Sequence, residues 1–305
     1  MNLTECFKIQ ILQADEEQRV LSELKPVYQV PCSGFTFGKE PTTIVADPFL
    51  FVKENTLYLF YESKKQYHPA VIKMVSTKDL KTWSDPVVVL AESFHLSFPW
   101  VFERDGHVYM IPETCGDQSV RLYEADDQTL THFHFVNKLM EDTECAENGF
   151  SFSDTSIHDK NGISYLFTTV NRKGYNEMEL YLSESFEGPY RKHPKSPISV
   201  DQKYARNAGC LFEWQGKLLR VAQDCSNRYG DNVNILSVDT LSPEEYGEHV
   251  LVDQFIDTKV PFYREGGHQL NTVQFLGKTI IATDAKEYHG FFWNRILHKL
   301  GMYRN

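Results

Sequence analysis

The sequence contains no block rich in lysine or arginine, and the chain of 305 residues has a formal net charge of −11. Proteins that bind the phosphates of a nucleic acid present a basic stripe, so this charge balance argues against a nucleic-acid partner. No uninterrupted apolar run approaches the roughly 20 residues that cross a bilayer. The opening residues, MNLTECFKIQILQADEEQRV, also lack the basic start and apolar run of a secretory signal.

Closely spaced cysteines are absent as well. None of the six cysteines forms a CxxC pair, and they are scattered at Cys6, Cys32, Cys115, Cys145, Cys210 and Cys225. This spacing argues against a structural zinc site and against a disulfide framework, and it favours reduced, mostly buried thiols. Together with the missing secretory signal, it predicts a cytoplasmic protein.

What the sequence does contain is a repeat. Five segments align without gaps, and they are DPFLFVKENTLYLFYE from Asp47, FPWVFERDGHVYMIPE from Phe98, DTSIHDKNGISYLFTT from Asp154, AGCLFEWQGKLLRVAQ from Ala208 and QLNTVQFLGKTIIATD from Gln269. Each has an apolar run, a turn and a second apolar run, and Asp-Gly or Asn-Gly at a turn is a strong hairpin signal. The segments start 51 to 61 residues apart, which leaves room for two further strands after each hairpin.

Four strands repeated at this period are typical of a β-propeller blade. We therefore predict an all-β protein with one five-bladed β-propeller over residues 1–290, whose blades begin near residues 46, 97, 153, 207 and 268. Too little sequence follows the fifth hairpin to complete its blade, so an N-terminal strand, CFKIQILQ or KPVYQVP, is expected to close the ring. A β-sandwich with similar hairpins is the alternative, and the ungapped five-fold register favours the propeller.

The register gathers polar residues at one end of the propeller axis. In a blade the first strand lines the central channel and the second runs antiparallel to it, so the start of the first and the end of the second meet at the same rim. The polar residues at and beside these positions are Asp47, Glu62, Glu113, Asp154, Arg206, Asn207, Gln223, Asp224, His268 and Asp284. Each alone reads as a solvated strand end, whereas the set predicts an active site in a central funnel.

Carboxylates gathered at one mouth indicate chemistry on glycosidic bonds. Hydrolysis uses one carboxylate to activate water and a protonated carboxyl to assist the leaving oxygen, and crowding raises the pKa of one of the two groups. We predict Asp47, Glu113 and Asp154 as catalytic residues and the other rim residues as saccharide-binding. Trp100 and Tyr229 are predicted to stack on a sugar ring, although core packing is the commoner role of such aromatic residues.

The chain resembles the five-bladed glycosidases of glycoside hydrolase families 43, 32 and 68, the group of arabinanases, levansucrases and invertases. The likeness lies in Ala46-Asp47-Pro48 entering blade one, Asp154 at the same column of blade three, Gly267-His268 entering blade five, and STKDLKTWSDPVVV. The resemblance implies that Asp47 is the general base and that Asp154 orients the substrate and tunes a pKa. It also places His268 on the axis, where a calcium or sodium ion is allowed, although no acidic loop requires one.

One member of that catalytic set is missing. The glycosidases carry a glutamate acid at the start of blade four, where this chain has Arg206-Asn207-Ala208-Gly209. Glu187, in SFEGPY, falls at an outer turn by the register, which leaves Glu113 as the candidate substitute. Because the ordinary acid is absent, plain hydrolysis is in question.

A second resemblance is to the propeller domain of plant glucosamine inositolphosphorylceramide transferases and of bacterial surface-polysaccharide biosynthesis proteins. It lies in FPWVFERDGHVYMIPET and ARNAGCLFEWQGKLLRVAQDCSNRYGDNVNI, and it implies sugar transfer or glycan recognition. Arg206 and Arg220, with Arg228 nearby, would then grip a phosphate or carboxylate. Salt bridges within an acidic protein explain these arginines equally well.

The final segment, GFFWNRILHKLGMYRN, has apolar residues at helical spacing and basic residues on its other faces. It predicts an amphipathic helix over residues 291–305. Such a helix either packs against the propeller or makes peripheral contact with the inner face of a membrane through Phe291–Asn305.

Three classes of function remain open from the sequence. The first is an enzyme acting on glycosidic bonds with hydrolase-like carboxylate chemistry, for which a cytosolic glycosyltransferase of surface-polysaccharide or glycolipid biosynthesis is the alternative. The second is a glycan-binding propeller without catalysis, and the third is a scaffold for protein partners. In the first two the expected substrate or ligand is a saccharide or glycoconjugate.

Overall fold

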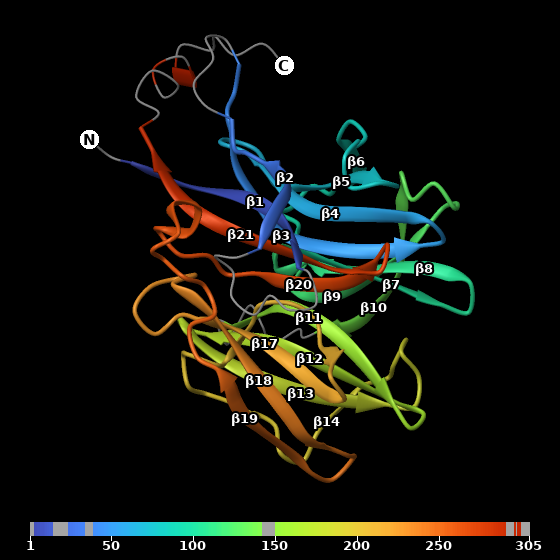
Figure 1. Ribbon diagram of the computed structural model, residues 1–305. Coiled ribbons are helices and arrows are strands. Elements are labelled where there is room, and N and C mark those ends of the chain that lie inside the picture. The colour runs from blue at the N-terminus through green and yellow to red at the C-terminus, as the bar shows by residue number, and fades with distance from the viewer. Residues whose placement is uncertain are drawn as a thin grey trace.

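The computed structural model describes residues 3–14, 24–33, 39–141 and 150–290, together with Ile296, His298 and Lys299. The strands of this part of the chain form five antiparallel sheets arranged around a common axis (Figure 1). The predicted five-bladed β-propeller is therefore confirmed, and the β-sandwich alternative is wrong.

Four blades are continuous in the sequence. Blade one comprises β3 (Thr42–Lys53), β4 (Thr56–Lys65), β5 (Val71–Thr77) and β6 (Val87–Leu90). Blade two comprises β7 (Ser97–Arg104), β8 (His107–Glu113), β9 (Ser119–Ala125) and β10 (Phe133–Glu141). Blade three comprises β11 (Phe150–Lys160), β12 (Ile163–Arg172), β13 (Tyr175–Ser183) and β14 (Arg191–Lys192). Blade four has a divided inner strand, β15 (Arg206–Asn207) and β16 (Phe212–Trp214), followed by β17 (Lys217–Asp224), β18 (Asn232–Leu241) and β19 (Tyr246–Val252).

The fifth blade joins both ends of the chain. Its inner strands are β20 (Leu270–Phe275) and β21 (Lys278–His289), and its outer strands are β1 (Thr4–Ala14) and β2 (Lys25–Val30). β1 pairs with β21 along its whole length, from Thr4 opposite His289 to Ala14 opposite Thr279. Both N-terminal segments considered for ring closure thus take part, because one hairpin leaves two strand positions of the blade to fill.

Apolar side chains pack between adjacent blades. Phe49 of blade one meets Phe98 of blade two edge to face, with ring centroids 4.7 Å apart, and Phe60 meets Phe133 in the same way at 5.9 Å. Edge-to-face pairs of this kind add stability beyond the area that they bury. They fix the spacing between blades and so hold the ends of the inner strands in register around the axis.

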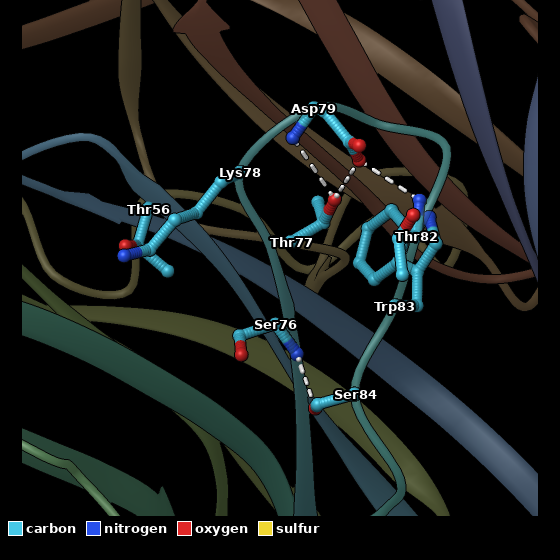
Figure 2. Close-up of a pocket in the computed structure, with 8 residues that line it drawn as sticks. All are labelled: Thr56, Ser76, Thr77, Lys78, Asp79, Thr82, Trp83 and Ser84. Atoms are coloured by element: carbon cyan, nitrogen blue, oxygen red, sulfur yellow. Dashed lines mark hydrogen bonds between the residues drawn. The ribbon is translucent and has the colours of Figure 1, made fainter.

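The sequence STKDLKTWSD forms a self-contained turn on the outer side of blade one. Asp79 Oδ1 accepts hydrogen bonds from the backbone N–H groups of Lys81 and Thr82, and Figure 2 shows the bond from Thr82. Trp83 stacks on Tyr28 of β2 at 4.2 Å. A hollow of about 310 Å³ lies beside this turn, lined by Thr56, Ser76, Thr77, Lys78, Asp79, Thr82, Trp83 and Ser84. Because the polar groups of Asp79 serve the turn itself, this motif supports the blade and does not belong to the axial site.

The predicted C-terminal helix falls almost wholly outside the described residues. Ile296, His298 and Lys299 are helical, and the helix as a whole and its membrane contact stay predictions. Within the described part of the chain, no helix has the length and apolar character needed to span a membrane.

Candidate functional site

The same backbone irregularity occurs at the same column of the first three blades. Asp47, Phe98 and Asp154 have φ angles of 52°, 46° and 51°, in the left-handed region. At each of them the pairing of the two inner strands skips, between Ala46 and Phe49 in the first blade and at the matching places in the next two. A bulge of this kind re-aims a side chain, and non-glycine residues adopt such angles at a cost of the order of 1–2 kcal/mol. Strain that recurs at one rim marks that rim as a candidate functional site.

The first cluster at this rim joins blade one to blade five. Asp284 Oδ2 lies 2.7 Å from His268 Nδ1 and accepts the backbone N–H of Asp47 at 3.2 Å. Asp284 Oδ1 accepts the backbone N–H groups of His268 and Gln269. Asp47 Oδ1 lies 3.6 Å from His268 Nδ1, while its Oδ2 accepts the backbone N–H of Phe98. Asp284 therefore positions His268, and Asp47 keeps one oxygen, Oδ1, directed at the imidazole.

The burial of this cluster shifts its proton equilibria. The pKa of Asp47 is raised to about 7. Burial is the largest cause, His268 opposes it, and the negative charges of Glu62, Asp284 and Asp154 add to it. Burial alone would lower the pKa of His268, but the carboxylates of Asp284 and Asp47 outweigh it and raise that pKa to about 9. At neutral pH the imidazole is therefore a cation, and Asp47 exchanges its proton readily.

The second cluster joins blades two, three and four. Arg206 Nε lies 2.8 Å from Asp154 Oδ2, and Arg206 Nη2 lies 3.8 Å from Glu113 Oε2. Burial raises the pKa of Asp154 to about 7; Arg206 opposes the shift, whereas Glu113 adds to it through its charge and a hydrogen bond. One guanidinium thus lies beside two carboxyl groups, and the buried one, Asp154, exchanges a proton near neutral pH.

Tyr229 connects the two clusters. The Arg206 guanidinium lies 5.1 Å from the centre of the Tyr229 ring, and the same ring meets His268 edge to face at 5.2 Å. The Tyr229 side chain is 44% exposed, whereas Asp47 and Asp154 are buried. Tyr229 therefore covers the charged groups on one side and offers its other side to solvent, as a platform for a sugar ring would.

The other predicted site residues lie at the same end of the blades but differ in their contacts. Glu62 pairs with His95, whose Nε2 lies 3.2 Å from Glu62 Oε1. The Asn207 amide donates to the backbone oxygen of Asp154 and ties blade four to blade three. Asp224 accepts two hydrogen bonds from Ser226 and shapes the loop that carries Tyr229. Gln223, opposite Arg206 in the sheet, is buried.

Trp100 and the two further arginines have contacts of another kind. Trp100 is buried in the apolar cluster between blades, where it stacks on Phe102 at 4.4 Å. Arg220 is fully buried and forms two hydrogen bonds with Glu248 of the outer strand β19. Arg228 pairs with Asp231 at the surface. Of the three arginines predicted as candidates for binding a phosphate or carboxylate, only Arg206 contacts the carboxylates near the axis. Arg220 and Arg228 form salt bridges elsewhere, as the alternative interpretation predicts.

Asp47, His268 and Asp284 also bring three metal-ligating atoms within 4.8 Å of one another. Hard cations such as calcium prefer an all-oxygen shell of six to eight ligands, and the protonated imidazole already supplies positive charge between the two carboxylates. This donor set fits such an ion poorly. The axial calcium or sodium ion allowed by the resemblance therefore enters no step proposed below.

A family model described as "Glucosamine inositolphosphorylceramide transferase 1, N-terminal" matches residues 6–282. The chain belongs to this family. Glucosamine inositolphosphorylceramide transferase 1 of Oryza sativa subsp. japonica is 35% identical over 225 residues, which cover 71% of this chain and 29% of the relative. The protein of the same name from Arabidopsis thaliana is 34% identical over 230 residues, covering 72% and 28%. The chain thus spans less than a third of the length of these relatives.

Solved structures show the same fold at low sequence identity. A Bacteroides ovatus protein titled "Xyloglucan PUL GH43B" aligns with a TM-score of 0.57 at 17% identity, over 83% of this chain and 52% of that one. The α-L-arabinanase of Cellvibrio cellulosa complexed with arabinohexaose gives 0.51 at 17%, over 67% and 77%. The family 117 glycoside hydrolase Zg3597 of Zobellia galactanivorans gives 0.53 at 14%, over 84% and 89%. These likenesses concern the propeller itself.

Sequence reasoning missed two participants in the site. Phe7 stacks on the His268 ring at 4.5 Å and belongs to β1, whose partner strand lies at the far end of the chain. His95 lies in the loop before β7, outside the columns of the repeat. The hairpin repeat predicts neither residue. The contact of Phe7 depends on closure of the ring, and that of His95 depends on the connection between blades one and two.

Proposed function

We propose that this family member binds a saccharide at the rim formed by Asp47, Asp154, Arg206, Tyr229 and His268, and that it acts there on glycosidic bonds by sugar transfer. The observation that carries the proposal is the pair Asp47 and Asp154. Matching bulges present these two aspartates at one end of the axis, in buried positions that raise both pKa values to about 7. Groups with such pKa values suit general acid–base work at neutral pH.

The start of blade four favours transfer over hydrolysis. A hydrolase of the carboxylate type needs a protonated acid for the leaving oxygen, and blade four supplies Arg206, whose guanidinium is held by Asp154 and Glu113. A donor whose leaving group is already a stable anion needs no such acid. The relatives named as transferases point in the same direction.

The residues of the chain suggest the following step. Asp47 Oδ1 takes the proton of an acceptor hydroxyl as the acceptor oxygen forms its bond to the anomeric carbon of the donor. The bond from that carbon to the leaving group breaks, and the leaving group departs with the electron pair. The imidazolium of His268, held by Asp284, favours the ionised form of Asp47 that this step requires, because a neighbouring positive charge stabilises a carboxylate.

The acidic rim also suits a particular class of sugar. Asp47, Glu113, Asp154 and Asp284 face the cations of Arg206 and His268, and Glu62 faces His95. Such a balance favours a ligand with a positive charge. Since the relatives' names include glucosamine, we propose that the bound saccharide carries a free amine.

Hydrolysis is the second candidate. Glu113 lies at the same rim as Asp154, and the pKa of Asp154 reflects a hydrogen bond between the two carboxyl groups. A proton held between them would serve a leaving oxygen. The five-bladed glycosidases with the same fold support this alternative as an analogy.

Calorimetric binding of glucosamine, N-acetylglucosamine and glucose tests the proposal. We expect glucosamine to bind at least about 10-fold more tightly than the other two, and Asp47→Asn and Asp154→Asn to lose this preference. Asp105→Asn is the matched control, because Asp105 has a φ of 52° at the opposite turn of blade two. Equal binding of all three sugars by the wild type would overturn the proposed sugar class.

Turnover separates the remaining functions. We expect transfer from an activated amino-sugar donor to an inositol-containing glycolipid acceptor, with loss in Asp47→Asn. Release of nitrophenol from nitrophenyl glycosides without an acceptor would select hydrolysis. Sugar binding that Asp47→Asn abolishes, without turnover of either kind, would select a glycan-binding propeller. Unchanged binding and turnover in both aspartate variants would rule the rim out as the site.

A further inference from the structure

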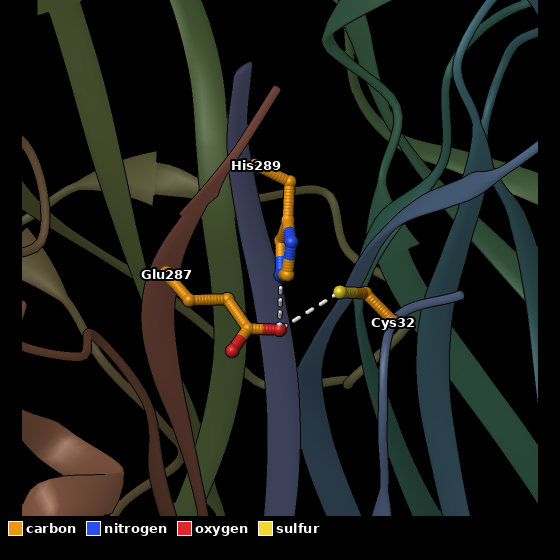
Figure 3. A group of neighbouring side chains, drawn as sticks. All are labelled: Cys32, Glu287 and His289. Carbon is orange, nitrogen blue, oxygen red and sulfur yellow. Dashed lines mark hydrogen bonds and ion pairs between the residues drawn. The ribbon is translucent and has the colours of Figure 1, made fainter. Parts of the chain in front are cut away.

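A second cluster of reactive side chains lies where the two ends of the chain meet in blade five. Cys32 follows β2, and its Sγ lies 2.8 Å from Glu287 Oε1 on β21. His289 Nε2 lies 3.0 Å from the same oxygen. Figure 3 shows the Cys32 and His289 side chains both directed at this oxygen. The sulfur, nitrogen and oxygen atoms of these three residues all lie within 4.8 Å of one another. Cys6, on β1 directly opposite Glu287, packs against Cys32 and exchanges a hydrogen bond with its thiol.

We propose that Cys6, Cys32, Glu287 and His289 bind a zinc ion that holds the propeller ring closed. Zinc takes thiolate, imidazole and carboxylate ligands in a tetrahedral set of four. Cys32, Glu287 and His289 offer one sulfur, one oxygen and one nitrogen, and Cys6 adds a second sulfur through its contact with Cys32. A donor set with two thiols favours zinc over calcium or magnesium, which prefer oxygen alone.

The local backbone brings these groups to one side of the sheet. Glu287 and His289 are two residues apart on β21, so their side chains point to the same face. β1 contributes Cys6 through its pairing with β21, and the segment after β2 contributes Cys32. Cys6 is fully buried and Cys32 is 9% exposed.

Lys8 provides the support that a metal-binding carboxylate requires. Its Nζ lies 2.9 Å from Glu287 Oε2, which leaves Oε1 directed at Cys32 and His289. Such outer partners orient metal ligands, and their loss typically lowers metal affinity by about 10- to 100-fold. The Cys32 thiol and the His289 ring both approach the single oxygen Oε1. A cation bound between the three groups would take the place of these two contacts.

The position of this cluster suggests its purpose. A metal here would link residues 6 and 32 to residues 287 and 289, and so would close almost the whole length of the chain into a loop. Constraints that close long loops remove the most conformational entropy from the unfolded chain. Metal binding would therefore contribute directly to folding of the ring.

The cluster is separate from the rim site. Glu287 pairs with Cys6, whereas Asp284 pairs with Ile9 and faces His268. The rim triad of Asp47, His268 and Asp284 contains no sulfur, so thiolate spectroscopy distinguishes the two places.

The test uses the full chain, stripped of metal with a chelator under reducing conditions and titrated with zinc and, separately, with cobalt. We expect one zinc per chain, a cobalt spectrum with thiolate charge-transfer bands, and a rise in thermal midpoint of about 5 °C when free zinc is about 100-fold above Kd. Cys32→Ser and His289→Ala should each weaken zinc binding by more than 100-fold. Serine preserves a hydrogen bond to Glu287, so metal-free Cys32→Ser should melt close to the metal-free wild type.

Two control variants address the alternatives. Cys225→Ser tests for a general loss of thiols, and Asp47→Asn tests whether the rim triad is the metal site; both should bind zinc as the wild type does. Zinc binding that survives in Cys32→Ser but is lost in Asp47→Asn would overturn the proposal. So would the absence of zinc binding in reduced protein, or a Cys6–Cys32 disulfide in peptides alkylated before reduction.

Discussion

The guanidinium of Arg206, at the start of blade four, lies 2.8 Å from the carboxylate of Asp154 in blade three. Arg206 is also 3.8 Å from Glu113, so one cation serves two acidic groups from neighbouring blades. In the proposed function, this fixed positive charge stands where a hydrolase would need a proton donor. It favours activation of an incoming hydroxyl over assisted departure of a sugar oxygen.

Removing this cation should destabilise the fold. Arg206→Gln leaves Asp154 and Glu113 buried without a counter-charge, and breaking a buried ion pair costs about 3–5 kcal/mol. Equilibrium unfolding in urea measures the loss. Arg228→Gln, which removes a surface pair with Asp231, is the matched control and should cost less than about 1 kcal/mol. Equal losses in the two variants would contradict the pairing of Arg206 described here.

The stability of the protein should fall as pH rises through the titration of His268. Its folded-state pKa of about 9 lies above the ordinary value of 6.5, so its contribution is complete below about pH 6.5 and is lost by the time the pH passes 9. The contribution is of the order of 3 kcal/mol. Unfolding free energies from pH 6 to 10 should show this decline in the wild type. The part of the decline between about pH 7.5 and 9 should be smaller in His268→Gln, and a decline of undiminished size there would assign it to another group.

Asp47→Asn should separate stability from function. The pKa of Asp47 is raised from 3.8 to about 7, so ionising this carboxyl lowers the stability of the fold as pH rises from about 4 through 7. Asparagine removes that cost, retains an oxygen for the Phe98 N–H, and tolerates the left-handed backbone. We expect equal or higher stability at pH 8 and loss of saccharide binding. A variant that is unstable yet still binds sugar would contradict this assignment.

Gly267 should tolerate no side chain. A Cβ at this position would lie 2.2 Å from the backbone oxygen of Asp284, so Gly267→Ala must displace either His268 or β21. We expect a loss of about 1–3 kcal/mol or more together with weaker saccharide binding. Gly247→Ala is the control, because its Cβ would meet Thr240 at an ordinary 3.7 Å. Thermal denaturation and calorimetry of the two variants give the comparison.

The sequence predicted the rim because hairpin register is a local property. Asp47 and Asp154 occupy matching columns, and Arg206 stands two residues before Ala208 in the same column, so similar spacing from a turn places them near one rim. The role of Arg220 could not be predicted in this way. It pairs with Glu248 on the outer strand, and the divided inner strand of blade four breaks the alternation from which the face of a side chain is predicted. The sequence predicts that an N-terminal strand closes the ring, but it offers two candidate segments and no signal for their register, so the partners of Cys6 and Phe7 could not be predicted.

That closure has a consequence for anything attached to the propeller. Thr4 lies opposite His289 at the end of the β1–β21 pair, three residues from Phe7, whose ring contacts His268. The chain therefore enters β1 and leaves β21 beside the rim that carries the charged clusters. A protein domain tethered there would meet the saccharide proposed for the rim at a high effective concentration. Even a short linker would then permit direct transfer of that saccharide between the domain and the rim.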